Sequence, residues 1–287
     1  MASNTTASTL PLRLPDAPFD LAQAQRAAVL LRWAYILTRA WEADNKPAPE
    51  SFSWAPTQAI EGLELGAPLW ASARGWKPFH NHQPFGFIAR EGELGYLVFR
   101  GTETPQDFGT NLRLDQIEYP FVSGFGHVHD GFAGLYAALR EPVLAELERL
   151  GLRSLIVAGH SMGAGVSSLA FCDLATNVEA LGGRVLHYCF GSPRVGNPEF
   201  AAAANALANP DGGWGVSYRL NNSADPVAHL PPMLRDKLLG EDVLYQHFGV
   251  GIELSANYGS IGVNHSVSRT YLYAIEHPEQ PHNPDAT

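Results

Sequence analysis

The sequence has few of the features that mark a membrane protein, a nucleic-acid-binding protein or a disulfide scaffold. Among 287 residues there are 2 cysteines, and 19 basic residues stand against 29 acidic ones. The formal net charge of -10, without a basic cluster, argues against a nucleic-acid partner or an anionic membrane surface. No apolar run approaches the ~18 residues that cross a bilayer. We therefore expect neither nucleic-acid binding nor stable membrane insertion.

The scarcity of cysteine also limits the chemistry. Cys172 and Cys189 lie in a predicted helix and a predicted strand, where two buried free thiols are the simpler expectation than a disulfide. No Cys-x-x-Cys pair or Cys/His metal spacing occurs, so we expect no metal and no cofactor. The first ten residues have no basic start and no apolar signal core. Either the protein stays in the cytoplasm or a signal peptide has been removed, and the compartment is left open.

Strand and helix patterns alternate along the chain without a repeat or a dividing linker. This alternation predicts a largely parallel α/β sheet covered on both faces. We expect an N-terminal arm over 1–18 and a single domain over 19–287, with an irregular stretch over 103–127. The predicted elements are helices over 20–42, with Asp20 as N-cap, 132–150, 163–176 and 266–276; a β-hairpin over 85–90 and 93–100; and strands over 155–158, 184–190, 215–220, 242–248 and 250–254, the last two paired.

Residues 159–163, Gly-His-Ser-Met-Gly, follow directly on the apolar run 155–158. The two glycines allow a tight strand-to-helix turn that presents the Ser161 hydroxyl as a nucleophile. Alone the pattern is weak, because a chain of this length and composition has on the order of one chance in ten of containing it. The strand before it and the helix after it strengthen the prediction. Ser161 is the predicted nucleophile.

A serine nucleophile needs a base and an acid that orients the base, which follow such a turn in the order acid, then histidine. Asp225 stands just beyond an apolar strand, where catalytic groups of such sheets lie, although by itself it would be interpreted as a turn cap. His265, in a loop before the last helix, is the predicted base, ahead of His229. The remaining candidates lie in a strand pattern or in the Pro-rich tail: His247, His277 and His282.

The developing oxyanion needs donors held in place beforehand. One is the backbone N–H of Met162 at the start of the helix. The other is Thr102, which follows the strand over 93–100 and offers a backbone N–H and a hydroxyl.

Five motifs follow one another along the chain: Phe-Arg-Gly-Thr at 99–102, Val-His-Asp-Gly-Phe at 128–132, Gly-His-Ser-Met-Gly at 159–163, Phe-Gly-Ser-Pro-Arg-Val-Gly-Asn at 190–197, and Asp-Pro-Val at 225–227 with Leu-Pro-Pro at 230–232. In this order they resemble the fungal-type class 3 lipases of the α/β-hydrolase superfamily. The resemblance implies an α/β-hydrolase fold with a central, mostly parallel sheet flanked by helices and a lid-like loop. It implies a triacylglycerol lipase or carboxylesterase with the triad Ser161, Asp225 and His265, the oxyanion hole Thr102 and Met162, and structural roles for His129 and His160.

The chain departs from the family pattern in three respects. Met-Gly-Ala-Gly follows Ser161 where Leu-Gly-Gly-Ala is common, and Asn264 precedes His265 where aspartate is common. The cysteines are also too few for the disulfides typical of the secreted members.

In the family, the segment after Thr102 carries the lid, here about 103–118. Its apolar residues form a narrow stripe on a polar segment, and the run 110–115 resembles the polar loop of feruloyl esterases. We therefore expect an enzyme for short to medium acyl chains with weak interfacial activation, whose partner is an ester or lipid substrate at a lipid–water interface. The predicted substrate-contacting residues are Phe108, Leu112, Pro193 and Val195.

Other interpretations stay open at this stage. A feruloyl-type esterase and a phospholipase A1-like enzyme use the same machinery. A catalytically inactive α/β-hydrolase fold acting as a binding protein is a different class. A metal hydrolase using His127, His129 and Asp130 lacks any His-Glu-x-x-His spacing, so structural histidines are favoured.

Overall fold

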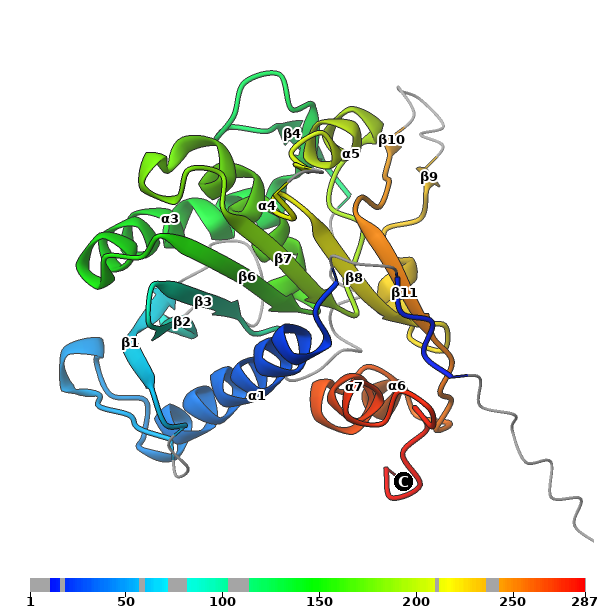
Figure 1. Cartoon of the computed structure of the whole chain (residues 1–287), viewed down its shortest axis with the longest axis horizontal. Coiled ribbons are helices and arrows are strands. Elements are labelled where there is room, and N and C mark those ends of the chain that lie inside the picture. Colours follow the sequence, from blue (N-terminus) through cyan, green and yellow to red (C-terminus); the bar gives the residue numbers. More distant parts are fainter. Residues whose placement is uncertain are drawn as a thin grey trace, which may run out of the picture.

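A seven-stranded sheet forms the centre of the protein in the computed structural model (Figure 1), which describes residues 11–15, 19–56, 60–71, 82–102, 114–209, 212–235 and 243–286. From β3 to β11 the strands are parallel, whereas β1, β2 and β3 are antiparallel neighbours. The prediction of a mostly parallel sheet with an antiparallel hairpin is confirmed. The spatial order is β1 (Leu63–Ala71), β2 (Gln83–Glu91), β3 (Leu94–Phe99), β6 (Ser154–His160), β7 (Val185–Phe190), β8 (Ser217–Asn222) and β11 (Val250–Leu254).

Helices cover both faces of this sheet and create two apolar cores (Figure 1). Side chains alternate along each strand, so that in β3 Leu97 and Phe99 face one core while Tyr96 and Val98 face the other. The first core lies under α3 (Asp130–Leu150) and α4 (Met162–Asn177). The second lies under α1 and the C-terminal helical segment: α1 (Leu21–Ala43), a π-helical turn η4 (Val267–Leu272) and α7 (Tyr273–Glu276).

Most of the predicted elements are confirmed within a few residues. Asp20 caps α1 by accepting a hydrogen bond from the backbone N–H of Gln23. Cys172 and Cys189 are free and buried, as expected. None of the described helices is long and apolar enough to cross a membrane. The smaller helices are α5 (Pro198–Asn205), α6 (Ile261–Asn264), η1 (Pro49–Ser51), η2 (Glu179–Leu181) and η3 (Pro226–His229).

The predicted pairing of 242–248 with 250–254 is wrong. Among the described residues of the first segment, the one strand is β10 (Val243–Leu244), and it pairs with β9 (Leu234–Arg235). β11 instead adds to the parallel edge of β8, where Ile252 and Leu254 join the second core. That burial favours the sheet edge over a local hairpin.

The stretch 103–127 is not wholly irregular. β4 (Gln116–Glu118) pairs antiparallel with β5 (His127–His129), and the two strands are joined by residues 119–126. Residues 103–113, which make up most of the predicted lid, lie outside the described residues, as do Phe108 and Leu112. Of the predicted arm, 1–10 and 16–18 are likewise outside them.

Candidate active site

Ser161 occupies the turn between β6 and α4 with an unusual backbone conformation, φ 58° and ψ -128°. A residue other than glycine seldom adopts a positive φ, and such backbone strain is typical of functional turns. The flanking glycines permit the turn. A Cβ on Gly159 would collide with the backbone of Gly163, and a Cβ on Gly163 would collide with the carbonyl groups that end β3. The Gly-x-Ser-x-Gly pattern is therefore required by close backbone packing.

The end of β3 packs directly against this turn. A Cβ on Gly101 would lie 2.5 Å from the Cβ of Ser161, so only glycine lets the two segments approach. Thr102 follows and is 7% exposed. Met162 is the first residue of α4, and the N–H groups of a first helical turn have no intrahelical acceptor. The predicted oxyanion donors thus lie on the two segments that meet at Ser161.

Asp225 and His265, the predicted acid and base, are in direct contact. The Nδ1 atom of His265 lies 2.6 Å from Oδ2 of Asp225. A carboxylate can only accept, so Nδ1 carries a proton, and in the neutral ring Nε2 is the nitrogen with a free lone pair. Within the described part of the chain, Nε2 of His265 and Oγ of Ser161 are both buried and have no hydrogen-bond partner. The two atoms that a triad would join are thus left available to each other.

Two further groups hold the Asp225 carboxylate. The backbone N–H of Val227 donates to Oδ1 over 3.0 Å, and the Tyr271 hydroxyl donates to Oδ2 over 2.5 Å. Burial, together with the negative charge of Asp225, raises the pKa of Tyr271 well above its usual value, which keeps the hydroxyl protonated. Sequence reasoning missed Tyr271; its position six residues after His265, in the helix that follows the base, is the only local signal.

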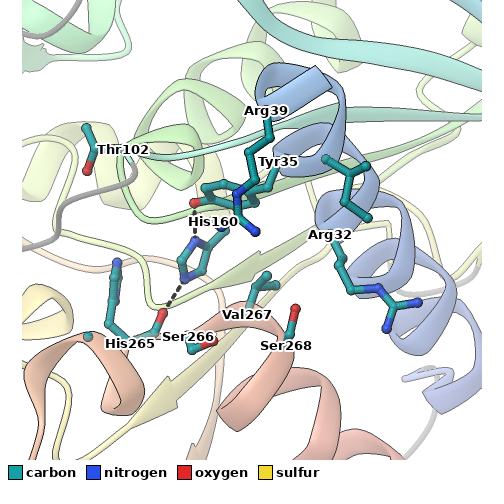
Figure 2. Close-up of a pocket in the computed structure, with 11 residues that line it drawn as sticks. Arg32, Tyr35, Arg39, Thr102, His160, His265, Ser266, Val267 and Ser268 are labelled. Atoms are coloured by element: carbon teal, nitrogen blue, oxygen red, sulfur yellow. Dashed lines mark hydrogen bonds between the residues drawn. The ribbon is translucent and has the colours of Figure 1, made fainter. Parts of the chain in front are cut away.

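His160 links the site to the first helix (Figure 2). Its Nε2 donates to the backbone carbonyl oxygen of His265 over 2.7 Å, so its Nδ1 accepts the hydrogen bond from the Tyr35 hydroxyl at 2.6 Å. The Tyr35 oxygen in turn accepts from the N–H of Gly101 over 2.9 Å. Burial lowers the pKa of His160 well below its usual value, which keeps the ring neutral and the polarity of this chain fixed. His160 is structural, as the resemblance implied.

Asparagines connect the loop of the acid with the loop of the base. Asn264 donates through Nδ2 to the carbonyl oxygen of Ala224 over 3.1 Å and accepts from the N–H of Tyr258 over 2.8 Å. Asn222 donates to the carbonyl oxygen of Asn264 over 3.0 Å. The asparagine before His265, unusual in the family pattern, therefore contributes a donor that aspartate lacks.

Gly191 shows why the motif at 190–197 has a glycine at its second position. It has a φ of +55°, and a Cβ there would lie 2.8 Å from Oδ2 of Asp225 and 3.0 Å from Cε1 of His265. Any side chain would displace the acid or the base.

A cavity of about 190 Å³ opens beside this arrangement, between α1 and the segment after α6 (Figure 2). His265 and Thr102 lie at one end of it and Arg32 lies at the other. Its remaining lining residues include Tyr35, Arg39 and Ser268.

The other sequence candidates lie elsewhere. His229 is exposed, and His247, half-buried and bonded to the carbonyl oxygen of Ala228, has its pKa lowered by desolvation to about 3. Pro193 and Val195 are buried away from the cavity, and their substrate role stays a prediction.

The histidines of the metal alternative do not form a site. His129 caps α3 through Nδ1, which accepts from the N–H of Phe132, whereas His127 is exposed. The described residues contain no group of three or more potential metal ligands.

Comparison with known proteins agrees with this architecture. Residues 96–235 match the family described as lipase (class 3). A lipase of Rhizomucor miehei is 34% identical over 143 residues, which cover 48% of this chain and 37% of the relative. The phospholipase A1 EG1 of Oryza sativa subsp. indica, described as chloroplastic/mitochondrial, is 32% identical over 209 residues, which cover 60% and 45% of the two chains. The match thus spans less than half the length of either relative.

Solved structures show the same fold. The nonglycosylated LIP2 lipase of Yarrowia lipolytica superposes with a TM-score of 0.59 and 18% sequence identity, over 85% of this chain and 81% of the other. The sheet order, the strained serine turn and the family match converge on one assignment. Residues 96–235 are those of a class 3 lipase, and the chain is similar to the fungal lipases in sequence over this segment and in its α/β-hydrolase fold.

Proposed function

We propose that this protein is a serine carboxylic-ester hydrolase that acts on lipid esters through an acyl-enzyme on Ser161. The contact between His265 Nδ1 and Asp225 Oδ2 carries this proposal, because it places the proton of the neutral imidazole on Nδ1 and makes Nε2 the basic nitrogen; among the described residues, Nε2 and the Ser161 hydroxyl are both buried without a hydrogen-bond partner. A hydroxyl in a strained turn and a neutral base of fixed tautomer are what nucleophilic acyl transfer needs.

In the proposed reaction, His265 Nε2 takes the proton of Ser161 as Oγ bonds to the ester carbonyl carbon. Asp225, held by Val227 and Tyr271, stabilises the imidazolium that forms. The same proton then passes to the alcohol oxygen as the carbon–oxygen bond breaks. A water molecule repeats the sequence and releases the acid.

In this mechanism, Met162 and Thr102 stabilise the negative charge that develops on the carbonyl oxygen. The N–H of Met162 stands at the positive end of α4, and Thr102 is held near the serine by the close approach of Gly101. Preorganised donors of this kind contribute about 3 kcal/mol each to the transition state.

The substrate class follows from the family. The relatives described as lipase and as phospholipase A1 support a lipid ester as substrate, and the finer preference rests on the polar sequence after Thr102. We propose short to medium acyl chains.

A serine-directed fluorophosphonate tests the mechanism. We expect stoichiometric labelling of the native protein and none of Ser161→Ala, with Ser167→Ala as a control that removes another buried serine on α4. A folded native protein that does not label would favour the inactive binding-protein alternative.

A panel of p-nitrophenyl esters from acetate to palmitate tests the chain-length preference. We expect the highest kcat/KM at or below about ten carbons. A maximal rate on palmitate, with a jump at the micellar threshold, would contradict it.

A further inference from the structure

Arg100, the residue that follows β3, is a buried cation that takes no part in the proton transfers. It is 2% exposed, and a charge removed from water is costly unless polar groups compensate it. Its Nε donates to the backbone carbonyl oxygen of Pro84 over 3.1 Å, and its Nη2 donates to Oε1 of Gln83 over 2.8 Å. The guanidinium also lies 5.7 Å from the centre of the Phe85 ring. Three consecutive residues of β2 thus fix the plane of the guanidinium.

The third nitrogen of this guanidinium is bonded to the peptide unit that carries a proposed oxyanion donor. Nη1 of Arg100 donates to the carbonyl oxygen of Gly101 over 2.7 Å. The N–H of the same peptide unit belongs to Thr102. In a planar trans peptide the C=O and the N–H point in opposite directions. Holding the carbonyl therefore also sets the direction of the Thr102 N–H.

The peptide unit on the other side of Gly101 is held as well. The Gly101 N–H donates to the Tyr35 hydroxyl over 2.9 Å. A Cβ at position 101 would lie 2.8 Å from the carbonyl oxygen of His160 and 2.5 Å from Cβ of Ser161, so this residue must be glycine. Glycine is the most conformationally free residue, and here each of its flanking peptide units is bonded to a buried side chain. The Thr102 N–H consequently keeps one direction relative to the serine.

The charge of Arg100 adds to this orientation. A hydrogen bond from a guanidinium is about twice as strong as one between neutral groups. It draws electron density toward the carbonyl oxygen, and polarisation of this kind strengthens the next hydrogen bond in a chain. Because the carbonyl of Gly101 and the N–H of Thr102 belong to one conjugated amide, the N–H becomes a stronger donor. The cation thus acts on a developing oxyanion through a single peptide unit.

We propose that Arg100 is a positioning residue of the oxyanion hole, which orients and polarises the peptide unit between Gly101 and Thr102 so that its N–H stabilises the tetrahedral intermediate. The inference rests on the proposed hydrolase function and adds a residue to its site. Arg100 itself forms no bond to the substrate and exchanges no proton with it. Lysine could supply the charge, but only the planar fork of arginine can bond Pro84, Gln83 and Gly101 at fixed angles.

Steady-state hydrolysis of p-nitrophenyl butyrate by Arg100→Lys and Arg100→Met tests this role. Complete loss of an oxyanion donor lowers kcat by a factor of about 100 to 1,000. A misdirected donor should cost less, so we expect kcat to fall about tenfold in the lysine variant and about a hundredfold in the methionine variant. KM should change less than about twofold, because the donor acts in the transition state. Native kcat in the methionine variant would overturn the proposal.

Arg184 provides a matched control. Its Nε donates to the carbonyl oxygens of Arg153 and Leu181 over 2.9 and 3.2 Å. It precedes β7, at the end of the sheet opposite to Ser161. The same lysine and methionine substitutions there should leave kcat within about twofold of the native value. Urea unfolding shows which variants are folded, and if Arg100→Met is not, the loss of about tenfold expected for Arg100→Lys decides.

A trifluoromethyl ketone separates the oxyanion hole from the rest of the site. Ser161 Oγ adds to its carbonyl carbon, the serine proton passes to His265, and the ketone oxygen becomes an anion that the hole binds. The corresponding secondary alcohol occupies the site without forming this anion. In the Arg100 variants we expect the Ki of the ketone to rise by the factor by which kcat falls, and the Ki of the alcohol to change less than about twofold. Equal losses of affinity for the two inhibitors would show a general structural role and overturn the proposal.

The same measurements distinguish the role of Arg100 from the function on which it rests. If the native protein neither hydrolyses the ester nor forms the hemiketal, detected by fluorine NMR, the proposed function fails and the role of Arg100 fails with it. If the native protein does both and the Arg100 variants match the Arg184 variants, the role of Arg100 alone is wrong.

Discussion

His160 Nε2 donates a hydrogen bond to the backbone carbonyl oxygen of His265 over 2.7 Å, and the two rings lie 4.5 Å apart between centroids. The residue just before the predicted nucleophile thus holds the backbone of the predicted base. Because Tyr35 fixes the other nitrogen of His160 and also receives the N–H of Gly101, one hydroxyl on α1 connects the serine turn, the base loop and the oxyanion segment.

Removing this hydroxyl should damage catalysis more than binding. We expect Tyr35→Phe to lower kcat about tenfold and to change KM less than about twofold, because base and oxyanion donors shift by a fraction of an ångström. Steady-state hydrolysis of a short p-nitrophenyl ester measures both constants. Tyr188→Phe, which removes a hydroxyl that also faces α1 through Gln23, is the control. Equal losses of kcat in the two variants would refute the positioning role.

The Tyr271 hydroxyl should support both activity and stability, because it holds the Asp225 carboxylate. Tyr271→Phe removes the donor to Asp225 Oδ2 and the acceptor of the Asn222 N–H, so we expect kcat/KM to fall about tenfold and the free energy of unfolding to fall by about 1–2 kcal/mol. Urea unfolding and ester kinetics measure the two effects. Tyr218→Phe deletes a buried hydroxyl that has no hydrogen-bond partner in the described part of the chain, so it should lower neither kcat/KM nor the free energy of unfolding. Wild-type kcat/KM in Tyr271→Phe would show that Val227 suffices to hold the carboxylate.

Asparagine at position 264 should not be exchangeable for the aspartate common in the family. Asn264→Asp replaces the donor to Ala224 and Asn257 with a charge that faces two acceptors. We expect the free energy of unfolding to drop by about 2–3 kcal/mol. Chemical denaturation at pH 7 measures the change. A variant as stable as the native protein would mean that the loop rearranges without cost.

Acid should destabilise the protein in part through His187. This buried ring lies between the Ser167 and Ser217 hydroxyls, and burial lowers its pKa from 6.5 to about 3. Below pH 6.5 this histidine is protonated in the unfolded chain but stays neutral in the folded protein. Its contribution to the free energy of unfolding is therefore lost as the pH falls from 6.5 towards 3.

His187→Gln keeps a donor and an acceptor but removes the titration. Between pH 7 and pH 5, we expect the native protein to lose about 2 kcal/mol more unfolding free energy than this variant. Urea unfolding at the two pH values provides the comparison. Identical losses would show that the ring is protonated in the folded state.

The local sequence pattern was sufficient to predict candidate residues that stand at the end of a strand or just before a helix. Ser161 and Asp225 follow strands, and His265 precedes a helix, so order and spacing predicted them. Tyr35 and Tyr271 could not be found in this way, because each acts across a contact between elements distant in sequence. On its own helix, Tyr35 is indistinguishable from any apolar core residue.

The missed elements have similar causes. β1 has no clean alternation, because none of the residues from Leu63 to Pro68 is fully buried and Pro68 interrupts the strand, so period-two patterning gave no signal. Within 242–248, the apolar residues Val243, Tyr245 and Phe248 are buried. These side chains are buried individually and do not form a strand beside 250–254, because β11 pairs with the edge of β8 instead.

The tyrosine on α1 has a consequence for recombining members of this family. Tyr35 and His265 both lie outside residues 96–235, which match the family description, whereas Ser161 and Asp225 lie within them. A chimera that exchanges only the matched segment would combine a nucleophile from one parent with a base, and the helix that holds that base, from another. A chimera should therefore take α1, the C-terminal helical segment and the serine turn from the same parent.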